Sequence, residues 1–204
     1  MSRVIRNRTS QNAPGANRLR IVGGRWRGMR IDFPAIGAIR PTPDRVRETL
    51  FNWLQTRIVE ARCLDLFAGS GALGFEALSR GASHVTLVDR EPEIARHLGA
   101  TLARFHATNA EVHTSDALRF LERPSQRFDI VFLDPPFASE VLPAICESLN
   151  RGWLNPSASI YIECSSRSAL PQLPMDWVIY RSKSAGEVGY HLLRAQGQMA
   201  EKLS

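Results

Sequence analysis

Short apolar runs along this chain alternate with stretches in which apolar residues recur every three or four positions. The runs predict buried strands, and the longer periodic stretches predict amphipathic helices. The predicted strands are Cys63–Phe67, His84–Asp89, Glu111–His113, Ile130–Leu133 and Ser159–Glu163. The predicted helices between them are Ala72–Ser79, Glu91–His106, Ala117–Glu122 and Glu140–Asn150. This alternation is typical of an α/β fold whose mostly parallel sheet carries helices on both faces.

Both ends of the chain depart from this alternation. Arg18–Phe33 alternates apolar and polar residues with glycine breaks, which predicts a β-hairpin. Pro34–Pro43 is predicted as a loop, after which Asp44 is expected to cap a helix. Near the other end, Trp177–Arg181 and Val188–Arg194 flank a glycine turn and predict an antiparallel hairpin at one edge of the sheet.

Composition limits the class of protein. The chain has 204 residues, of which 44% are hydrophobic and 23% charged, and these values suit one soluble α/β domain with a small extension. Its apolar stretches are too short to span a membrane, and the N-terminus lacks the apolar core of a signal peptide. Three cysteines without a CxxC pair predict neither disulfides nor a metal site, and we expect a cytoplasmic protein.

Positive charge is concentrated near the N-terminus. Lys and Arg outnumber Asp and Glu by 26 to 20, and residues 1–30 contain eight arginines and no acid. Guanidinium groups are planar and permanently charged, so a block of this kind suits contacts with nucleic-acid phosphates. Residues 1–17 taken alone are better explained as a flexible basic tail.

A glycine-rich turn follows the strand predicted at Cys63–Phe67. Gly69, Gly71 and Gly74 have the G-x-G-x-x-G spacing, which on its own fits a dinucleotide as well as S-adenosylmethionine. Asp65 separates the two, because a carboxylate about 4–6 Å from a pyrophosphate opposes it by roughly 3–4 kcal/mol at an effective dielectric constant near 20. The ammonium and sulfonium of S-adenosylmethionine would instead attract it. We therefore expect S-adenosylmethionine at this turn, with Phe67 and Ala68 among its contacts.

Acidic residues also end the next two predicted strands. Asp89 is placed to accept hydrogen bonds from ribose hydroxyls, and Asp116, followed by Ala117, to accept from the adenine amino group. Taken singly, Asp65 and Asp116 are explained equally well as caps of helices or turns. Because the carboxyl ends of parallel strands meet at one edge of a sheet, three acids there favour a ligand site.

A second motif, Asp134-Pro135-Pro136-Phe137, follows the strand predicted at Ile130–Leu133. An exocyclic amino group on a base is a poor nucleophile because its lone pair is delocalised into the ring. The Asp134 carboxylate and a backbone carbonyl can accept its hydrogens, and the two prolines remove competing N–H donors. Phe137 can stack on an extruded base, although a loop aromatic often only packs. The motif predicts methylation of a base amino group by alignment and proton acceptance.

These motifs, together with Leu19–Gly28 (LRIVGGRWRG) and Arg40–Leu54 (RPTPDRVRETLFNWL), resemble the bacterial RsmD family of 16S ribosomal RNA guanine-N2 methyltransferases. The resemblance runs from about Leu19 to Arg194. It implies a Rossmann-like class I methyltransferase fold, with a seven-stranded, mostly parallel sheet, an antiparallel C-terminal strand and an N-terminal β-hairpin on the RNA side. It also implies S-adenosylmethionine as cofactor, a guanine of the small ribosomal subunit or its assembly intermediate as acceptor, and a monomer.

The resemblance assigns further residues. Arg40–Arg47 is expected to lie across the cofactor through Thr42 and Arg45, although Arg45 and Arg47 fit equally well as surface charges of a helix. Thr42-Pro43 departs from the two threonines that are more common in the family. Arg90 is expected beside the adenine ring, where a solvated charge is an equal alternative. The expected RNA contacts are Arg20, Arg25, Trp26, Arg27, Arg30 and Arg40.

We expect four segments: a basic tail (1–17), an RNA-side hairpin and loop (18–43), a methyltransferase domain (44–196) and a C-terminal tail (197–204). Three other functions fit parts of the sequence. The chemistry of the Asp-Pro-Pro-Phe motif also suits methylation of DNA adenine N6, but no target-recognition domain is evident. The glycine turn also suits an NAD-dependent oxidoreductase, against which Asp65 and Asp134–Phe137 count. A non-catalytic RNA-binding protein would use the basic block alone.

Overall fold

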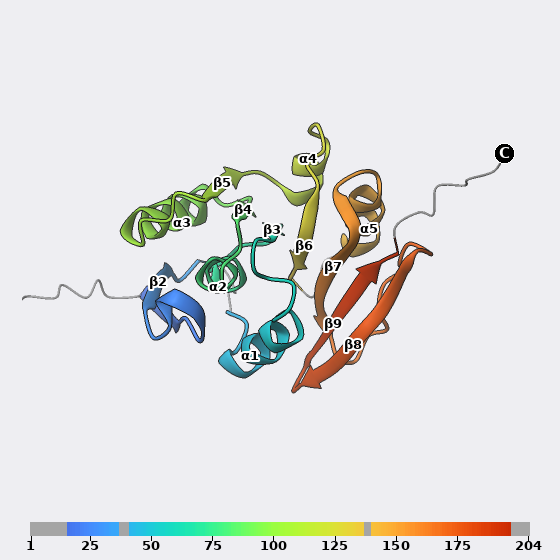
Figure 1. The fold of residues 1–204 in the computed structure, drawn as a ribbon, viewed down its shortest axis with the longest axis horizontal. Coiled ribbons are helices and arrows are strands. Elements are labelled where there is room, and N and C mark those ends of the chain that lie inside the picture. Colours follow the sequence, from blue (N-terminus) through green and yellow to red (C-terminus); the bar gives the residue numbers. More distant parts are fainter. Residues whose placement is uncertain (1–15, 37–40, 137–139, 197–204) are drawn as a thin grey trace, which may run out of the picture.

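The computed structural model describes residues 16–36, 41–136 and 140–196. A seven-stranded sheet with the order β5-β4-β3-β6-β7-β9-β8 forms its centre (Figure 1). Its strands are β3 (Arg62–Asp65), β4 (His84–Asp89), β5 (Ala110–Thr114), β6 (Phe128–Leu133), β7 (Leu154–Ser165), β8 (Trp177–Ala185) and β9 (Val188–Ala195). β3 to β7 pair in parallel, and β9 pairs antiparallel with both β7 and β8. This arrangement confirms the mostly parallel sheet and the C-terminal hairpin predicted at its edge.

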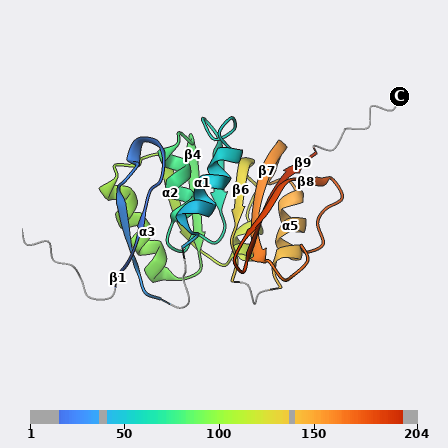
Figure 2. The same cartoon turned by 90° about the horizontal axis from the view of Figure 1, so that it is seen from below.

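Helices cover both faces of the sheet. Figures 1 and 2 show α1 (Asp44–Trp53), α2 (Ala72–Ser79) and α3 (Pro92–Arg104) on one face, and α4 (Ala117–Leu121) and α5 (Leu142–Asn150) on the other. Successive residues of a strand point to opposite faces. In β6, Phe132 accordingly joins the apolar cluster beneath α1 and α2, and Leu133 joins the cluster beneath α4 and α5. The chain therefore buries two apolar layers, one on each side of a single sheet.

The predicted N-terminal hairpin forms a separate two-stranded sheet from β1 (Ala16–Arg20) and β2 (Arg30–Pro34). A short 3₁₀ helix, η1 (Gly24–Trp26), which was not predicted, lies between the two strands. The Trp26 side chain is only 8% exposed, and its ring centroid lies 4.9 Å from that of Phe105, just beyond α3. The indole therefore fixes the hairpin to the core and leaves little of its surface exposed, and the contact of Trp26 with RNA stays a prediction.

Several boundaries also differ from expectation, among them the start of α1 and that of β7. The N-cap of α1 is Pro43, so Asp44 lies one residue inside the helix, where its carboxylate pairs with Arg47. The strand predicted at Ser159–Glu163 is the buried part of the longer β7. In the described ranges, none of the helices has the length and apolar character needed to cross a membrane.

Candidate active site

Three acidic side chains gather where β3, β6 and β7 end. Asp65 is the last residue of β3, Asp134 directly follows β6, and Glu163 lies near the end of β7. Register pairs Asp65 with Phe132 and Leu133 with Ile162. Because side chains alternate between faces, all three carboxylates point to the face that carries α1 and α2. The order of the strands reverses between β3 and β6, and α/β folds bind ligands at such a point.

Burial makes these carboxylates hard to ionise. Asp65 is 1% exposed, and burial, with smaller contributions from the charges of Asp89 and Glu163, raises its pKa to about 7. The pKa of Asp134 is raised by burial and then by the charges of Glu163 and Asp65, and burial also raises the pKa of Glu163. A cationic ligand would relieve this repulsion.

The glycine turn brings backbone close to the same edge. Gly71 has a φ of +78°, and a Cβ atom there would collide with the ring of Phe75. A Cβ atom on Gly74 would collide with Leu87 of β4. The Gly74 N–H donates to Asp65 Oδ2 over 3.2 Å, whereas the buried Asp65 Oδ1 has no hydrogen-bond partner among the described residues. An unmatched acceptor beside a close backbone turn fits the ammonium end of S-adenosylmethionine.

The next two predicted acids differ in role. Asp89 Oδ2 accepts from the Gly69 N–H over 2.8 Å, which ties the glycine turn to β4. Each Asp89 oxygen has a second lone pair for a ribose hydroxyl. Asp116 is the N-cap of α4, and its Oδ1 accepts from two N–H groups of that helix. The capping explanation therefore holds for Asp116, and its contact with adenine stays a prediction.

The residues expected over the cofactor are divided between the site and the surface. Thr42 is buried, and its Oγ1 donates to Asp134 Oδ2 over 3.4 Å. Arg45 is exposed on α1. The Arg90 side chain is 71% exposed and pairs with Glu91 over 3.3 Å. The cofactor contacts of Arg45 and Arg90 stay predictions.

The other predicted site residues lie close to these groups. Phe67 is half-buried, and Ala68 is buried and donates its N–H to Val88 O over 2.9 Å. Ala117 is buried as the first residue of α4. After β6, Pro135 is buried and Pro136 is exposed. Phe137 and Arg40 lie outside the described residues.

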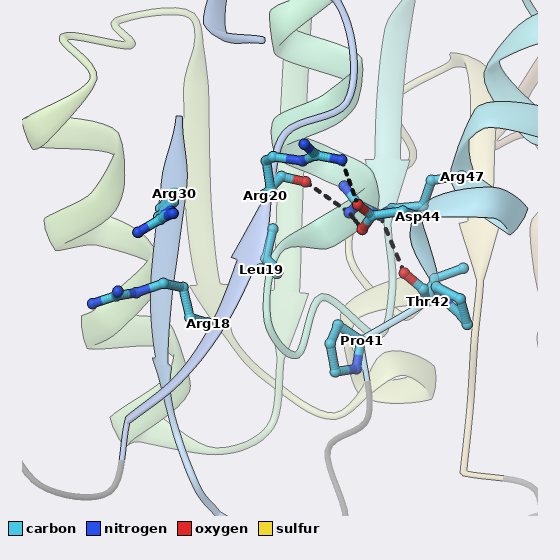
Figure 3. A pocket seen from close by; sticks show the side chains of 9 residues that line it. Arg18, Leu19, Arg20, Arg30, Pro41, Thr42, Asp44 and Arg47 are labelled. Atoms are coloured by element: carbon cyan, nitrogen blue, oxygen red, sulfur yellow. Dashed lines mark hydrogen bonds and ion pairs between the residues drawn. The ribbon is translucent and has the colours of Figure 1, made fainter. Parts of the chain in front are cut away.

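Arg47 was not among the predicted site residues, although it is only 1% exposed. Its Nη1 lies 3.3 Å from Oε2 of Glu76, which is fully buried in α2. Its Nε donates to Thr42 O over 3.1 Å and its Nη2 to Arg20 O over 2.7 Å (Figure 3). Arg47 thus joins the hairpin, the loop before α1 and the helix that follows the glycine turn. Arg47 is three residues before Leu50 and so lies on the apolar face of α1. This spacing was the signal in the sequence that could have predicted its burial.

Glu163 was also missed. It is 3% exposed, and its Oε1 accepts from the Tyr161 hydroxyl over 2.9 Å. The available signal was an acidic residue inside the apolar run Ile160–Cys164, since buried carboxylates are rare unless they are paired or functional.

Basic side chains surround an open pocket of about 520 Å³ between the hairpin and the loop before α1 (Figure 3). Arg18, Arg20 and Arg30 line it from the hairpin, and Thr42 lines it from the loop. Acids partly neutralise it, since Arg18 lies 2.7 Å from Asp32 and Arg20 lies 3.3 Å from Asp44. Arg25 and Arg27 are exposed on the turn of the hairpin. The pocket therefore connects the basic hairpin to the residue that contacts Asp134.

Comparisons with known proteins identify the family. Residues 19–194 match the family described as Conserved hypothetical protein 95. The chain belongs to this family. It is 45% identical over 188 residues to ribosomal RNA small subunit methyltransferase D of Escherichia coli strain K12, covering 92% of this chain and 95% of the relative. The protein of the same name in Haemophilus influenzae is 42% identical and matches 89% of this chain and 95% of its own length. The predicted resemblance is confirmed.

Solved structures show the same fold. The putative methyltransferase yhhF from Escherichia coli superposes with a TM-score of 0.84 at 45% identity, covering 89% of this chain and 100% of that one. An RNA methyltransferase from Salinibacter ruber, solved in complex with S-adenosyl-L-homocysteine, shares the fold at 15% identity, with a TM-score of 0.57 over 81% of this chain and 99% of that one. The chain therefore has the class I methyltransferase fold that the sequence predicted.

Proposed function

We propose that this protein is an S-adenosylmethionine-dependent methyltransferase that modifies the exocyclic N2 of a guanine in the 16S RNA of the small ribosomal subunit. The observation that carries the proposal is the Asp134 carboxylate, which lies at the strand-order reversal beside Asp65 and the glycine turn. The names of its relatives in Escherichia coli and Haemophilus influenzae support small-subunit ribosomal RNA as the substrate class.

The chain's own residues supply alignment and proton acceptance. S-adenosylmethionine, when bound, supplies an electrophilic methyl group on a sulfonium. The Asp134 carboxylate and the Pro135 carbonyl accept the two hydrogens of the target amine, so that the nitrogen lone pair faces the methyl carbon. As the N–C bond forms and the C–S bond breaks, Asp134 accepts the proton that the nitrogen sheds. The raised pKa of Asp134 makes it a stronger base for this step.

The remaining segments position the RNA. Residues 18–43 form the RNA-side extension, on which Arg20, Arg25, Arg27 and Arg30 are exposed. Guanidinium contacts with phosphates would orient the RNA without reading its sequence. Residues 44–196 form the methyltransferase domain. We further propose that the protein acts in the cytoplasm as a monomer, on the small subunit or an assembly intermediate.

Purified protein, labelled S-adenosylmethionine and small-subunit particles from cells that lack the enzyme test the proposed function. Naked 16S RNA and duplex DNA serve as parallel substrates. Digestion and mass spectrometry should place the label on N2 of one guanine of the ribosomal RNA. Label on adenine N6 of DNA, or no label on guanine N2 in either particles or naked RNA, would reject the assignment.

Cofactor affinity should depend on pH through Asp65. Its pKa is raised to about 7, so the side chain becomes neutral as the pH falls below that value and no longer attracts a cation. We expect the Kd of S-adenosylmethionine to rise by roughly tenfold for each pH unit below this pKa. Asp65→Asn should bind about 10- to 100-fold more weakly at pH 8 and show a flatter profile. Isothermal calorimetry measures both effects.

The matched control is Glu147→Gln, the same loss of a carboxylate on the exposed side of α5, with a side chain that is 74% exposed in the parent. It should keep the parent affinity and pH profile. An unchanged pH dependence in Asp65→Asn would show that another group controls cofactor binding.

A further inference from the structure

Two side-chain hydrogen bonds lie between β7 and the target-amine site. The Tyr161 hydroxyl donates to Glu163 Oε1 over 2.9 Å. The Thr42 hydroxyl lies 3.4 Å from Asp134 Oδ2, and hydrogen bonding by the same hydroxyl lowers the pKa of Glu163. Register pairs Leu133 with Ile162, so Asp134 and Glu163 come next to each other on neighbouring strands, and the Thr42 hydroxyl is close to both carboxylates.

The two acids compete for one hydrogen. A threonine hydroxyl has a single O–H donor, so at any moment it satisfies Asp134 or Glu163 and not both. The backbone of Thr42 is held in place, because its carbonyl accepts from Arg47 Nε over 3.1 Å (Figure 3). With the backbone of Thr42 anchored in this way, the orientation of Asp134 depends on how Glu163 shares the hydroxyl donor.

We propose that Glu163 is a positioning residue for methyl transfer, which orients the Asp134 carboxylate toward the target amine through the Thr42 hydroxyl. The inference rests on the proposed function of Asp134 as the acceptor of the amine hydrogens. Glu163 is only 3% exposed and interacts with the Thr42 hydroxyl, so it acts through that residue rather than by touching the base. A serine or threonine at position 42 and an acid at position 163 are the features that this role requires.

The charges around the pair determine the sign of its pH dependence. Among the described residues, the charged groups that raise the pKa of Asp134 are acids. The charges of Asp134 and Glu163 in turn raise the pKa values of an acid, a phenol and a thiol. These groups are Asp65 on β3 and Tyr161 and Cys164 on β7. Removing the charge of Glu163 therefore lowers the pKa of Asp134, whereas removing the Thr42 hydroxyl raises it.

Two variants with opposite expected effects test the inference. Glu163→Gln keeps the volume of the side chain and removes its charge, and Thr42→Val keeps the shape and removes the hydroxyl. With saturating cofactor and 16S RNA, each should lower kcat by about tenfold, with little change in the KM for RNA. In a plot of kcat against pH, the acid limb reports the pKa of Asp134. This limb should move to lower pH in Glu163→Gln and to higher pH in Thr42→Val. Thr42→Ser should restore both kcat and the limb.

Several outcomes would overturn the inference. These are an unchanged kcat and acid limb in Glu163→Gln, limbs that move in the same direction in both variants, or a Thr42→Ser protein that behaves like Thr42→Val. If thermal unfolding shows that Glu163→Gln does not fold, the Thr42 variants decide alone. They do so through the direction in which the acid limb moves in Thr42→Val and through the recovery of kcat in Thr42→Ser. Glu147→Gln should match the parent throughout. An inactive parent in the same assay would instead reject the proposed function.

Discussion

Asp134→Asn should lower kcat for RNA methylation about a thousandfold while leaving the affinity for S-adenosylmethionine close to that of the parent. Asparagine keeps the size of the side chain and one acceptor oxygen but cannot take a proton from the reacting nitrogen. The unmatched acceptor at the glycine turn belongs to Asp65, which this substitution leaves in place. Single-turnover rates with excess RNA measure the loss, and calorimetry measures cofactor binding.

Asp134→Ala extends the test by removing both acceptor oxygens, and we expect no detectable methylation. Glu147→Gln on the exposed side of α5 is the control for loss of a carboxylate. A large loss of cofactor affinity in either Asp134 variant would place this residue in the cofactor half of the site. Methylation at the parent rate would show that the Asp134 carboxylate is not the proton acceptor.

The centre of the sheet was predictable because β3, β4 and β6 are buried on both faces. Such strands appear in the sequence as short apolar runs, and β4 and α2 were located to the residue. The ends of parallel strands meet at one edge, so the acids after successive strands were expected there as well. The start of β7 was missed because Asn155, Pro156 and Ser157 interrupt the apolar run and are at least partly exposed.

Contacts between distant segments were not predictable. Trp26 lies among arginines in the sequence, which suggested an RNA contact, yet its partner Phe105 is far along the chain. An arginine counts as polar in any hydrophobic pattern, so Arg47 looked like a surface charge. Its burial depends on Glu76, 29 residues away, which the pattern of α1 alone does not reveal.

The Thr42 prediction shows the same limit at the site itself. The family resemblance placed this residue over the cofactor. This chain has Thr42-Pro43 where the family more often has two threonines, which left the hydrogen bonding of the loop open. In the structure its hydroxyl faces Asp134, because the loop before α1 lies on the same face of the sheet as the carboxylates. The alternation of residues along β6 shows which face of the sheet Asp134 lies on. It contains no information about the loop before α1, which is distant in sequence and packs on the same face.

Arg47→Met should lower the free energy of unfolding by about 3 kcal/mol. Methionine fills most of the volume but removes the guanidinium, which leaves the Thr42 and Arg20 carbonyls without this donor and the buried Glu76 without one of its cations. Arg45→Met is the matched control, since Arg45 is exposed on the same helix, and it should change stability by at most about 0.5 kcal/mol. Denaturant unfolding followed by circular dichroism measures both variants, and equal losses would contradict the role of burial.

A double variant separates the ion pair from general packing damage. Glu76 also accepts from Arg80 Nε over 2.8 Å and from the Val22 N–H over 2.9 Å, so it stabilises α2 and the hairpin as well. Glu76→Gln alone leaves the Arg47 guanidinium buried with only the partly exposed Asp44 as an anion. In Arg47→Met, the same change instead removes a buried carboxylate that has lost one of its two cations. The loss in Arg47→Met/Glu76→Gln should therefore be smaller than the sum of the two single losses by about 1 kcal/mol or more. Additive losses would mean that Arg47 stabilises the protein by filling space rather than by holding the hairpin, the Thr42 loop and α2 together through charge.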